Sequence, residues 1–339
     1  ASMLEDKLEK ALDLLCEILT GTQLRDKTRM YQLLCQQRSS LFEQTVMSGD
    51  AAAQRRIMAR TCAEGAINEY VGGVEYLRWL KDLEDNFDAR FEGLCEELVR
   101  LSGMIFTAAG LTLGVTCQKP GIERAAAKLL KQGLPAGEPY RPANTPVRPW
   151  PPAREGIIIP ADVSFAALGG SFAPAATGGA KVMGRAVSLG YLWNAVRVQG
   201  GAYGVGMVLR DNGFACFSSF RDPTPGRTLG CYTASADFLE DFCGGQVDLT
   251  AMILGAVAQA DPLLTPRLKG AVADIRYFRG VTHEDLCRTR QETLSASPQD
   301  ILELRGQLRE LYAGGSVCVL GSKGQIEDCK DKLESVSTL

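Results

Sequence analysis

The chain has 339 residues, 45% of them apolar and 23% charged, with a formal net charge of −3. This length suits about two globular domains, and no apolar run approaches the roughly 20 residues that span a bilayer. Acidic and basic residues are interspersed, so the composition excludes a strongly basic protein and predicts neither a nucleic-acid partner nor a membrane partner.

Residues 1–134 are predicted to be mostly helical. Apolar side chains recur at helical spacing in three segments, and a fourth helix is expected after them; the four ranges are 4–19, 30–42, 91–101 and 122–132. Before the fourth helix lies LTLGVTC, residues 111–117, which is predicted to be a short strand.

A proline-rich segment follows the helical part. Residues 135–152, PAGEPYRPANTPVRPWPP, contain seven prolines and show no helical or alternating pattern. Proline fixes φ and removes a backbone donor, so residues 135–153 are predicted to be an extended linker. The linker divides the chain into a first part, 1–134, and a second part, 154–339.

The second part is predicted to be an α+β unit. Strand-like sequence over 156–172 precedes a helix over 176–199 and a hairpin with arms 202–210 and 214–220. The residues that join the arms, Asp211-Asn212-Gly213, tolerate a positive φ. The remaining expected elements are helices over 228–242 and 249–260, a helix capped by Thr282 with Asp285, a helix from Ser297 with Pro298 in its first turn, a strand over 316–321 and a last helix over 326–333.

Both parts contain the order helix, glycine, short strand, helix, which predicts two copies of one unit. One strand cannot form a sheet alone, so residues 111–117 would need partner strands that the first copy lacks. We therefore expect the chain to be the carboxy-terminal piece of a longer protein, cut inside its penultimate unit. The expected fold class is α+β, with a truncated, mostly helical first unit and a complete second unit.

The residue types exclude several kinds of catalytic site within this chain. His283 is the only histidine, so a histidine-rich zinc site cannot form here, and we predict no bound metal. A Cys/His pair would have to combine His283 with Cys287, a spacing that chance explains. VCVLGSKGQIED, near the end of the chain, has the wrong spacing for a Walker loop. The eleven cysteines contain no C-x-x-C pair, which predicts reduced core thiols and a reducing compartment, the cytoplasm or an organelle matrix.

The stretch YLWNAVRVQGGAYGVGMVLRDNG, residues 191–213, places glycines between a helix and a strand. Phosphate loops run the other way, from strand to helix, so Gly200 and Gly201 are interpreted as a helix stop. Arg197 and Tyr203 would then share one corner, where two donors can bind a peptide carbonyl or an oxyanion. The residues alone leave a structural role open, in which Arg197 caps the helix and Tyr203 packs.

This stretch resembles the carboxy-terminal half of pitrilysin/insulinase-type zinc metallopeptidases, in their presequence-protease and falcilysin branch. The resemblance is carried by Leu192-Trp193-Asn194, by the run from Arg197 to Gly204 and by Arg221-Asp222-Pro223. The first part, including GGVEYLRWLKDLEDNFD and LTLGVTCQ, is similar to the peptidase-associated region of the same branch. Together these similarities account for nearly the whole chain.

The resemblance implies a clamshell of four related α+β units in two halves. The amino-terminal half would carry His-x-x-Glu-His and the zinc, and this chain would supply Arg197 and Tyr203 to bind the substrate near the scissile bond. The implied partners are that zinc-bearing half and unstructured peptides. The chain alone is expected to bind no zinc and to show no proteolysis.

Two other interpretations stay open. The chain would instead be a native non-catalytic subunit that pairs with a separate zinc subunit, or a peptide-binding scaffold module without an enzymatic partner. A His-x-x-Glu-His motif upstream in the same reading frame would identify the chain as part of a single-chain peptidase and would argue against these two alternatives.

Overall fold

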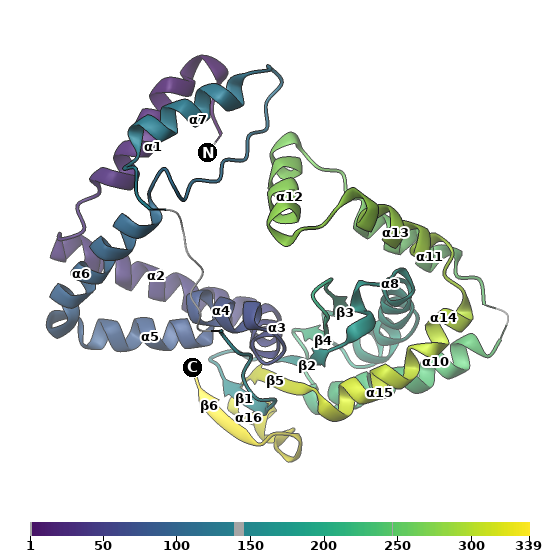
Figure 1. Cartoon of the computed structure of the whole chain (residues 1–339). Helices are drawn as coiled ribbons and strands as arrows, with labels where there is room; N and C mark the ends of the chain where they lie inside the picture. The colour runs from purple at the N-terminus through teal and green to yellow at the C-terminus, as the bar shows by residue number, and fades with distance from the viewer. Residues whose placement is uncertain (1, 139–145, 246) are drawn as a thin grey trace. The chain divides into compact units, whose positions relative to one another are not determined.

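The computed structural model describes residues 2–138, 146–245 and 247–339. The chain folds into two compact units whose segments alternate along the sequence (Figure 1). Unit 1 comprises Ala1–Gln37, Lys81–Pro146 and Leu263–Val281, and unit 2 comprises Arg38–Leu80, Val147–Pro262 and Thr282–Leu339. Residues 139–145 of the predicted linker lie outside the described residues, and the predicted boundaries at 134 and 154 stay a prediction.

Unit 1 is helical. Its elements are η1 (Glu5–Lys7), α1 (Leu8–Gly21), the first part of α2 (Lys27–Met47), the end of α5 (Val74–Asp85), α6 (Phe87–Ile105), α7 (Ile122–Gly133) and α12 (Pro266–Arg279). Leu12 and Cys16 of α1 pack against Ala126 and Leu130 of α7 in a small buried cluster. The four helices predicted in residues 1–134 are therefore confirmed, whereas α12 was not predicted.

Residues 111–117 form no strand, so the prediction of a short strand there is wrong. The segment is irregular, and most of its residues are exposed. It passes close to α12, where a Cβ added at Gly114 would lie 2.2 Å from Oδ1 of Asp274. An alternating sequence pattern forms a strand only beside a hydrogen-bonded neighbour, and no strand pairs with this segment among the described residues.

Unit 2 is built on a six-stranded mixed sheet with the order β3-β4-β2-β5-β1-β6. The strands are β1 (Arg154–Ile158), β2 (Phe165–Ser171), β3 (Gly204–Leu209), β4 (Phe214–Phe220), β5 (Ser316–Gly321) and β6 (Ser335–Thr338). β1 is parallel to β5 and β6, and the other neighbouring pairs are antiparallel. The hairpin and the strand over 316–321 are confirmed, and β3 lies at one edge of the sheet.

The helices of unit 2 cover both faces of this sheet. Besides parts of α2 and α5, they are α3 (Gly49–Ala59), α4 (Ala63–Gly72), η2 (Ala173–Ala176), α8 (Gly178–Arg185), η3 (Ala186–Val198), α9 (Pro225–Thr233), α10 (Ser235–Cys243), α11 (Thr250–Ala260), α13 (His283–Leu294), α14 (Pro298–Glu303), α15 (Arg305–Gly314), α16 (Lys323–Glu327) and η4 (Lys330–Lys332). The capping box of Thr282 with Asp285 is confirmed. The helix predicted over 326–333 is wrong in extent, because α16 ends at Glu327.

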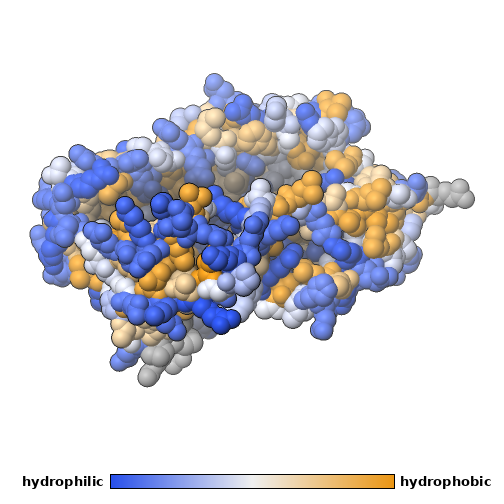
Figure 2. Space-filling model, turned by 90° about the horizontal axis from the view of Figure 1, so that it is seen from above, coloured by the Kyte–Doolittle hydropathy of each residue, from blue (hydrophilic) through white to orange (hydrophobic). Residues whose placement is uncertain are grey.

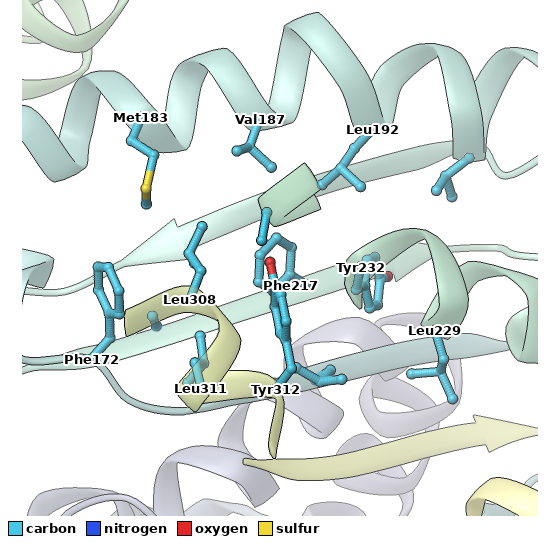
Figure 3. Packing of buried hydrophobic residues seen from close by; sticks show 14 of the residues in the cluster. Phe172, Met183, Val187, Leu192, Phe217, Leu229, Tyr232, Leu308, Leu311 and Tyr312 are labelled. Atoms are coloured by element: carbon cyan, nitrogen blue, oxygen red, sulfur yellow. The ribbon is translucent and has the colours of Figure 1, made fainter. Parts of the chain in front are cut away.

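α3 packs on one face of the sheet, and α8, η3, α10 and α15 contribute to the core on the other. Ala53 and Ile57 of α3 are fully buried with Phe165, Cys216 and Leu320. On the opposite face, Figure 3 shows Met183, Val187 and Leu192 pointing from the helix into the layer of buried side chains that includes Phe172 and Phe217. The sheet is thus buried on both faces, and residues 38–80 share a core with the strands.

The surface carries both apolar and polar residues. On the face drawn in Figure 2, apolar residues form several separate groups among hydrophilic ones. Among the described helices, none is long and apolar enough to cross a membrane.

Candidate functional site

Arg197, a predicted site residue, lies on a helix that is α-helical in its first part and π-helical in its second part. The single helix predicted over 176–199 is α8 followed directly by the π-helical η3, and the N–H of Gln199 donates to the carbonyl of Asn194, five residues earlier, at 2.9 Å. Val187, Leu192 and Val196 are fully buried on its inner side. π-helical geometry is rare and is often found at functional sites.

The other side of this helix presents a row of residues at four-residue spacing. The row consists of Arg185, Leu189, Trp193 and Arg197, and the side chains of Leu189 and Trp193 are 46% and 41% exposed. These residues come from successive turns, so they lie along one side of the helix. We call this set the 185–197 row.

Two glycines end the helix, as the sequence predicts. Gly201 has φ +80, and its N–H donates to the carbonyl of Arg197 at 3.0 Å. A Cβ at Gly200 would lie 2.4 Å from the carbonyl oxygen of Val196, a contact that real Cβ atoms do not make. Glycine is required at both positions, and the interpretation of the pair as a helix stop is confirmed.

The structure brings Arg197 and Tyr203 together at this corner. Cζ of Arg197 lies 4.0 Å from the ring centre of Trp193 and 5.8 Å from that of Tyr203. The N–H of Tyr203 donates to the carbonyl of Phe220 at 3.0 Å, and the two rings meet edge to face at 5.9 Å. The backbone of Tyr203 is therefore fixed by the hairpin, while its side chain is 69% exposed.

Among the residues that the structure describes, no hydrogen bond or ion pair engages the guanidinium of Arg197 or the hydroxyl of Tyr203. The last carbonyls of the helix have other donors. Nη1 of Arg227 donates to the oxygen of Ala195 at 2.8 Å, and backbone N–H groups after the helix donate to the carbonyls of Val196 and Arg197. The capping role that the sequence left open for Arg197 is therefore filled by Arg227 and by these backbone groups.

Sequence reasoning assigned no role to Trp193, which is the stacking partner of Arg197. A guanidinium over an indole ring is a favourable cation–π contact of about 0.5–2 kcal/mol, and it fixes the direction of a long side chain. The signal was present in the sequence, because Trp193 and Arg197 have the i,i+4 spacing of neighbours on a helix. The spacing alone could not show that the ring faces the guanidinium.

The described residues do not fit a catalytic zinc site. No group of three or more His, Cys, Asp or Glu side chains within 2–138, 146–245 and 247–339 could hold a metal ion. Nε2 of His283 lies 3.3 Å from Sγ of Cys287, on an exposed turn of α13. Two groups fall short of the three protein ligands that a catalytic zinc takes.

The cysteines differ strongly in exposure. All eleven are free; Cys216 and Cys318 are buried, and burial raises the pKa of both thiols well above its ordinary value. Cys117 in unit 1 and Cys287 in unit 2 are exposed. The buried thiols act as small core residues, as predicted from their sequence context.

Two known protein families match separate regions of the chain. Residues 1–83 match the family "Peptidase M16C associated", and residues 154–312 match the family "PreP C-terminal domain". The second region contains the corner with Arg197 and Tyr203. The two regions lie on either side of residues 135–153.

Curated relatives are similar over most of this chain. Protein HypA of Clostridium perfringens is 26% identical over 99% of the chain and 35% of its own length. Presequence protease 1, chloroplastic/mitochondrial, of Arabidopsis thaliana is 30% identical over 91% of the chain and 29% of its own length. The chain thus spans about a third of the length of these relatives.

Solved structures share the fold. A structure described as the peptidase M16 inactive domain from Pseudomonas fluorescens has a TM-score of 0.59 at 12% identity, over 94% of this chain and 76% of that one. Pitrilysin has a TM-score of 0.56 at 12% identity, over 93% of this chain and 33% of its own. At such identities the likeness supports the α+β fold and nothing finer.

Proposed function

This chain belongs to the presequence-protease type of M16 peptidases, as a carboxy-terminal part, and from that premise we propose that it binds peptide substrates of a metalloendopeptidase through Arg197 and Tyr203. The observation that carries the proposal is the exposed corner where these two side chains lie 5.8 Å apart, from Cζ to ring centre, without hydrogen-bond partners among the described residues. The corner lies within the region matched to the PreP C-terminal domain.

The two side chains suit a peptide carbonyl. A guanidinium offers five N–H donors in a fixed plane, and a phenol offers one O–H donor. Trp193 holds the guanidinium by stacking, and the Gly200–Gly201 stop fixes the distance from the helix to Tyr203. Donors held in place before the reaction stabilise a developing oxyanion without reorganisation, which is the most effective form of electrostatic catalysis.

The metal chemistry belongs, in this proposal, to a separate amino-terminal half that carries the zinc. The residues of this chain bind and orient the substrate, and closure of the two halves places them beside the scissile bond. The two closed halves would enclose a chamber, and the substrates that enter it would be unstructured peptides. Relatives named as chloroplastic or mitochondrial, such as presequence protease 1, are compatible with an organelle matrix as the location of the protein.

The test replaces Tyr203 in the protein combined with its zinc-bearing half. Tyr203→Phe removes one O–H donor while keeping the ring contact with Phe220, so we expect kcat to fall about 10²–10³-fold with little change in stability. The measurement is steady-state cleavage of an unstructured fluorogenic peptide, with thermal unfolding of each variant alongside.

Tyr277→Phe is the matched control, because Tyr277 is 74% exposed on α12 and belongs to unit 1. The Tyr277→Phe variant should cleave the peptide with the same kcat as the unmodified protein. Unchanged cleavage by Tyr203→Phe would exclude the proposed role. A peptide-binding scaffold would instead bind the peptide without raising cleavage by the zinc-bearing half.

A further inference from the structure

A hollow of about 340 Å³ lies in unit 2 beside the Arg197 corner. Its walls come from α8, η3, β3 and α11, and three members of the 185–197 row, Arg185, Leu189 and Trp193, line it. Trp193 stacks on Arg197 and also lines the hollow, so the two features are continuous. We call this hollow the β3 pocket.

Arg185 brings a positive charge that nothing described neutralises. Its Nε is buried and has no hydrogen-bond partner among the described residues. The guanidinium lies against Gly255 of α11, where a Cβ would come within 2.9 Å of Nε and 3.0 Å of Nη2. A buried donor left unpaired costs about 1–3 kcal/mol, and more when it is charged. A carboxylate that binds the guanidinium from the side that lines the pocket would supply the missing counter-charge.

The other charges of the β3 pocket compensate each other. Nζ of Lys181 lies 3.3 Å from Oδ1 of Asp211, and both residues line the pocket. The remaining wall near Trp193 is largely apolar, with Leu189 and Met207. The pocket therefore has one uncompensated positive charge, and the apolar part of its lining suits the aliphatic stem of a side chain.

The edge of β3 offers backbone groups to an extended chain. Gly206 and Val208 are in register with Ser218 and Cys216, and the N–H of Arg210 donates to the carbonyl of Phe214 at 2.9 Å. Hydrogen-bonded and non-hydrogen-bonded positions alternate in antiparallel pairs. The backbone groups of Val205, Met207 and Leu209 therefore point to the free edge, where Oγ of Ser188 already accepts the Met207 N–H at 3.0 Å.

The distance between Arg197 and Arg185 determines how many residues of an extended peptide would lie between them. Twelve residues of helix at about 1.5 Å each separate them by at most about 18 Å. An extended peptide covers that distance in about five residues, at about 3.3 Å each. β3 runs beside this helix, because a Cβ at Gly184 would contact Leu209, at the far end of β3 from Tyr203.

We propose that the β3 pocket is a substrate subsite for an acidic side chain, Asp or Glu, about five residues away from the peptide bond held by Arg197 and Tyr203. The position relative to that bond rests on the proposed function, but the preference for a carboxylate does not. Arg185 pairs with the carboxylate, and the apolar wall beside Trp193 holds the stem of the side chain.

The test measures binding of unstructured peptides to this chain by fluorescence anisotropy. Each peptide is amidated at its carboxyl end and carries one Glu, and its matched partner has Gln at the same position. We expect the Glu peptide to bind about tenfold more tightly at the best position. Arg185→Gln should abolish the difference, and Gly255→Ala should reduce it, because its Cβ displaces the guanidinium. Lys323→Gln, which removes an exposed charge on α16, should leave the difference unchanged.

Two results would overturn the subsite. One is an equal Glu and Gln affinity at every position, and the other is a Glu preference that survives Arg185→Gln. A peptide with a free carboxyl end provides a further arm: if its affinity depends on Arg185 while the internal Glu does not matter, the pocket binds a chain terminus and the proposal is wrong.

A cleavage assay of the protein combined with its zinc-bearing half tests the subsite and the proposed function independently. Arg185→Gln should raise KM for the Glu peptide alone and leave kcat unchanged, whereas Tyr203→Phe should lower kcat for both peptides. A Glu preference in binding together with full activity of Tyr203→Phe would retain the subsite and exclude the proposed function.

Discussion

Arg56 joins several helices to the sheet of unit 2 through paired carboxylates. Its Nε and Nη2 donate to the two carboxylate oxygens of Glu155 on β1 at 2.9 and 2.7 Å. Its Nη1 donates to Glu75 at 2.9 Å and to Glu69 at 3.2 Å. Burial acts to raise the pKa of Glu155, but the hydrogen bonds and charges of Arg56 and Arg60 outweigh it and hold this pKa below its usual value.

This pKa predicts how stability depends on pH. Because the folded pKa of Glu155 lies below its unfolded pKa, its stabilisation is fully present above the unfolded pKa, about 4.3, and is lost as the pH falls through the folded pKa. We expect Glu155→Gln to lower the free energy of unfolding by about 3 kcal/mol at pH 7. Between pH 5 and 3, the free energy of unfolding should then decrease less steeply in this variant than in the unmodified protein.

Urea unfolding at several pH values measures this effect. Glu310→Gln is the control, because Glu310 is exposed on α15. Equal acid dependence in the two variants would contradict the role assigned to Glu155.

At the scale of elements, the end of η3 determines where the corner lies. The chain turns there through a residue with φ +80, Gly201, and the next described element is the edge strand β3. A residue with a Cβ in this left-handed region is strained by about 1–2 kcal/mol. The helix stop therefore controls both local stability and the separation of Arg197 from Tyr203.

Gly201→Ala should lower the free energy of unfolding by about 1–2 kcal/mol and weaken peptide binding at the corner. Gly230→Ala is the matched control, since a Cβ at Gly230 in α9 would meet nothing within 4 Å. Alanine is the better helix former, so this control should be neutral or stabilising by up to about 1 kcal/mol. Equal effects of the two substitutions would show that the stop at Gly201 carries no strain.

Local patterns predicted most elements of the fold. Helical periodicity identified α1, α2, α6 and α7, turn residues identified the β3–β4 hairpin, and the Thr282 cap identified the start of α13. Two of the failures were tertiary in origin. Residues 111–117 have the pattern of a strand but no partner, and β6 exists because β1 offers it an edge. The π geometry of η3 has no signature in composition.

Part of the candidate site could be predicted from the sequence and part could not. Arg197 and Tyr203 are separated by five residues that include a glycine stop, so the sequence alone could bring them together. Arg185 and its contact with Gly255 depend on α11 packing against α8, which joins segments far apart in the chain. Such contacts follow from the packed core and cannot be read from spacing.

At the scale of the whole molecule, the two matched family regions share one hydrophobic core. α3 comes from the region 1–83 and covers the sheet face formed by strands of the region 154–312 and by β5. Ile57 is fully buried between them. The sheet of unit 2 therefore depends on residues far upstream of its first strand.

Ile57→Ala should lower the free energy of unfolding by about 2–5 kcal/mol and speed hydrogen exchange in β2 and β5, because it opens a cavity against the sheet. Ile275→Ala, at a position that is 56% exposed on α12, should change stability by less than about 0.5 kcal/mol. If exchange in β2 and β5 stayed slow in Ile57→Ala, α3 would be a peripheral attachment to the sheet.

The uneven burial of the thiols gives the protein a built-in pair of labelling positions. Cys117 and Cys287 are exposed, one in each compact unit, while Cys216 and Cys318 are buried with raised pKa and resist alkylation. Brief treatment with a maleimide dye pair at neutral pH would favour these two positions. A dye on each of these two thiols would then mark unit 1 and unit 2 separately, without any engineered cysteine.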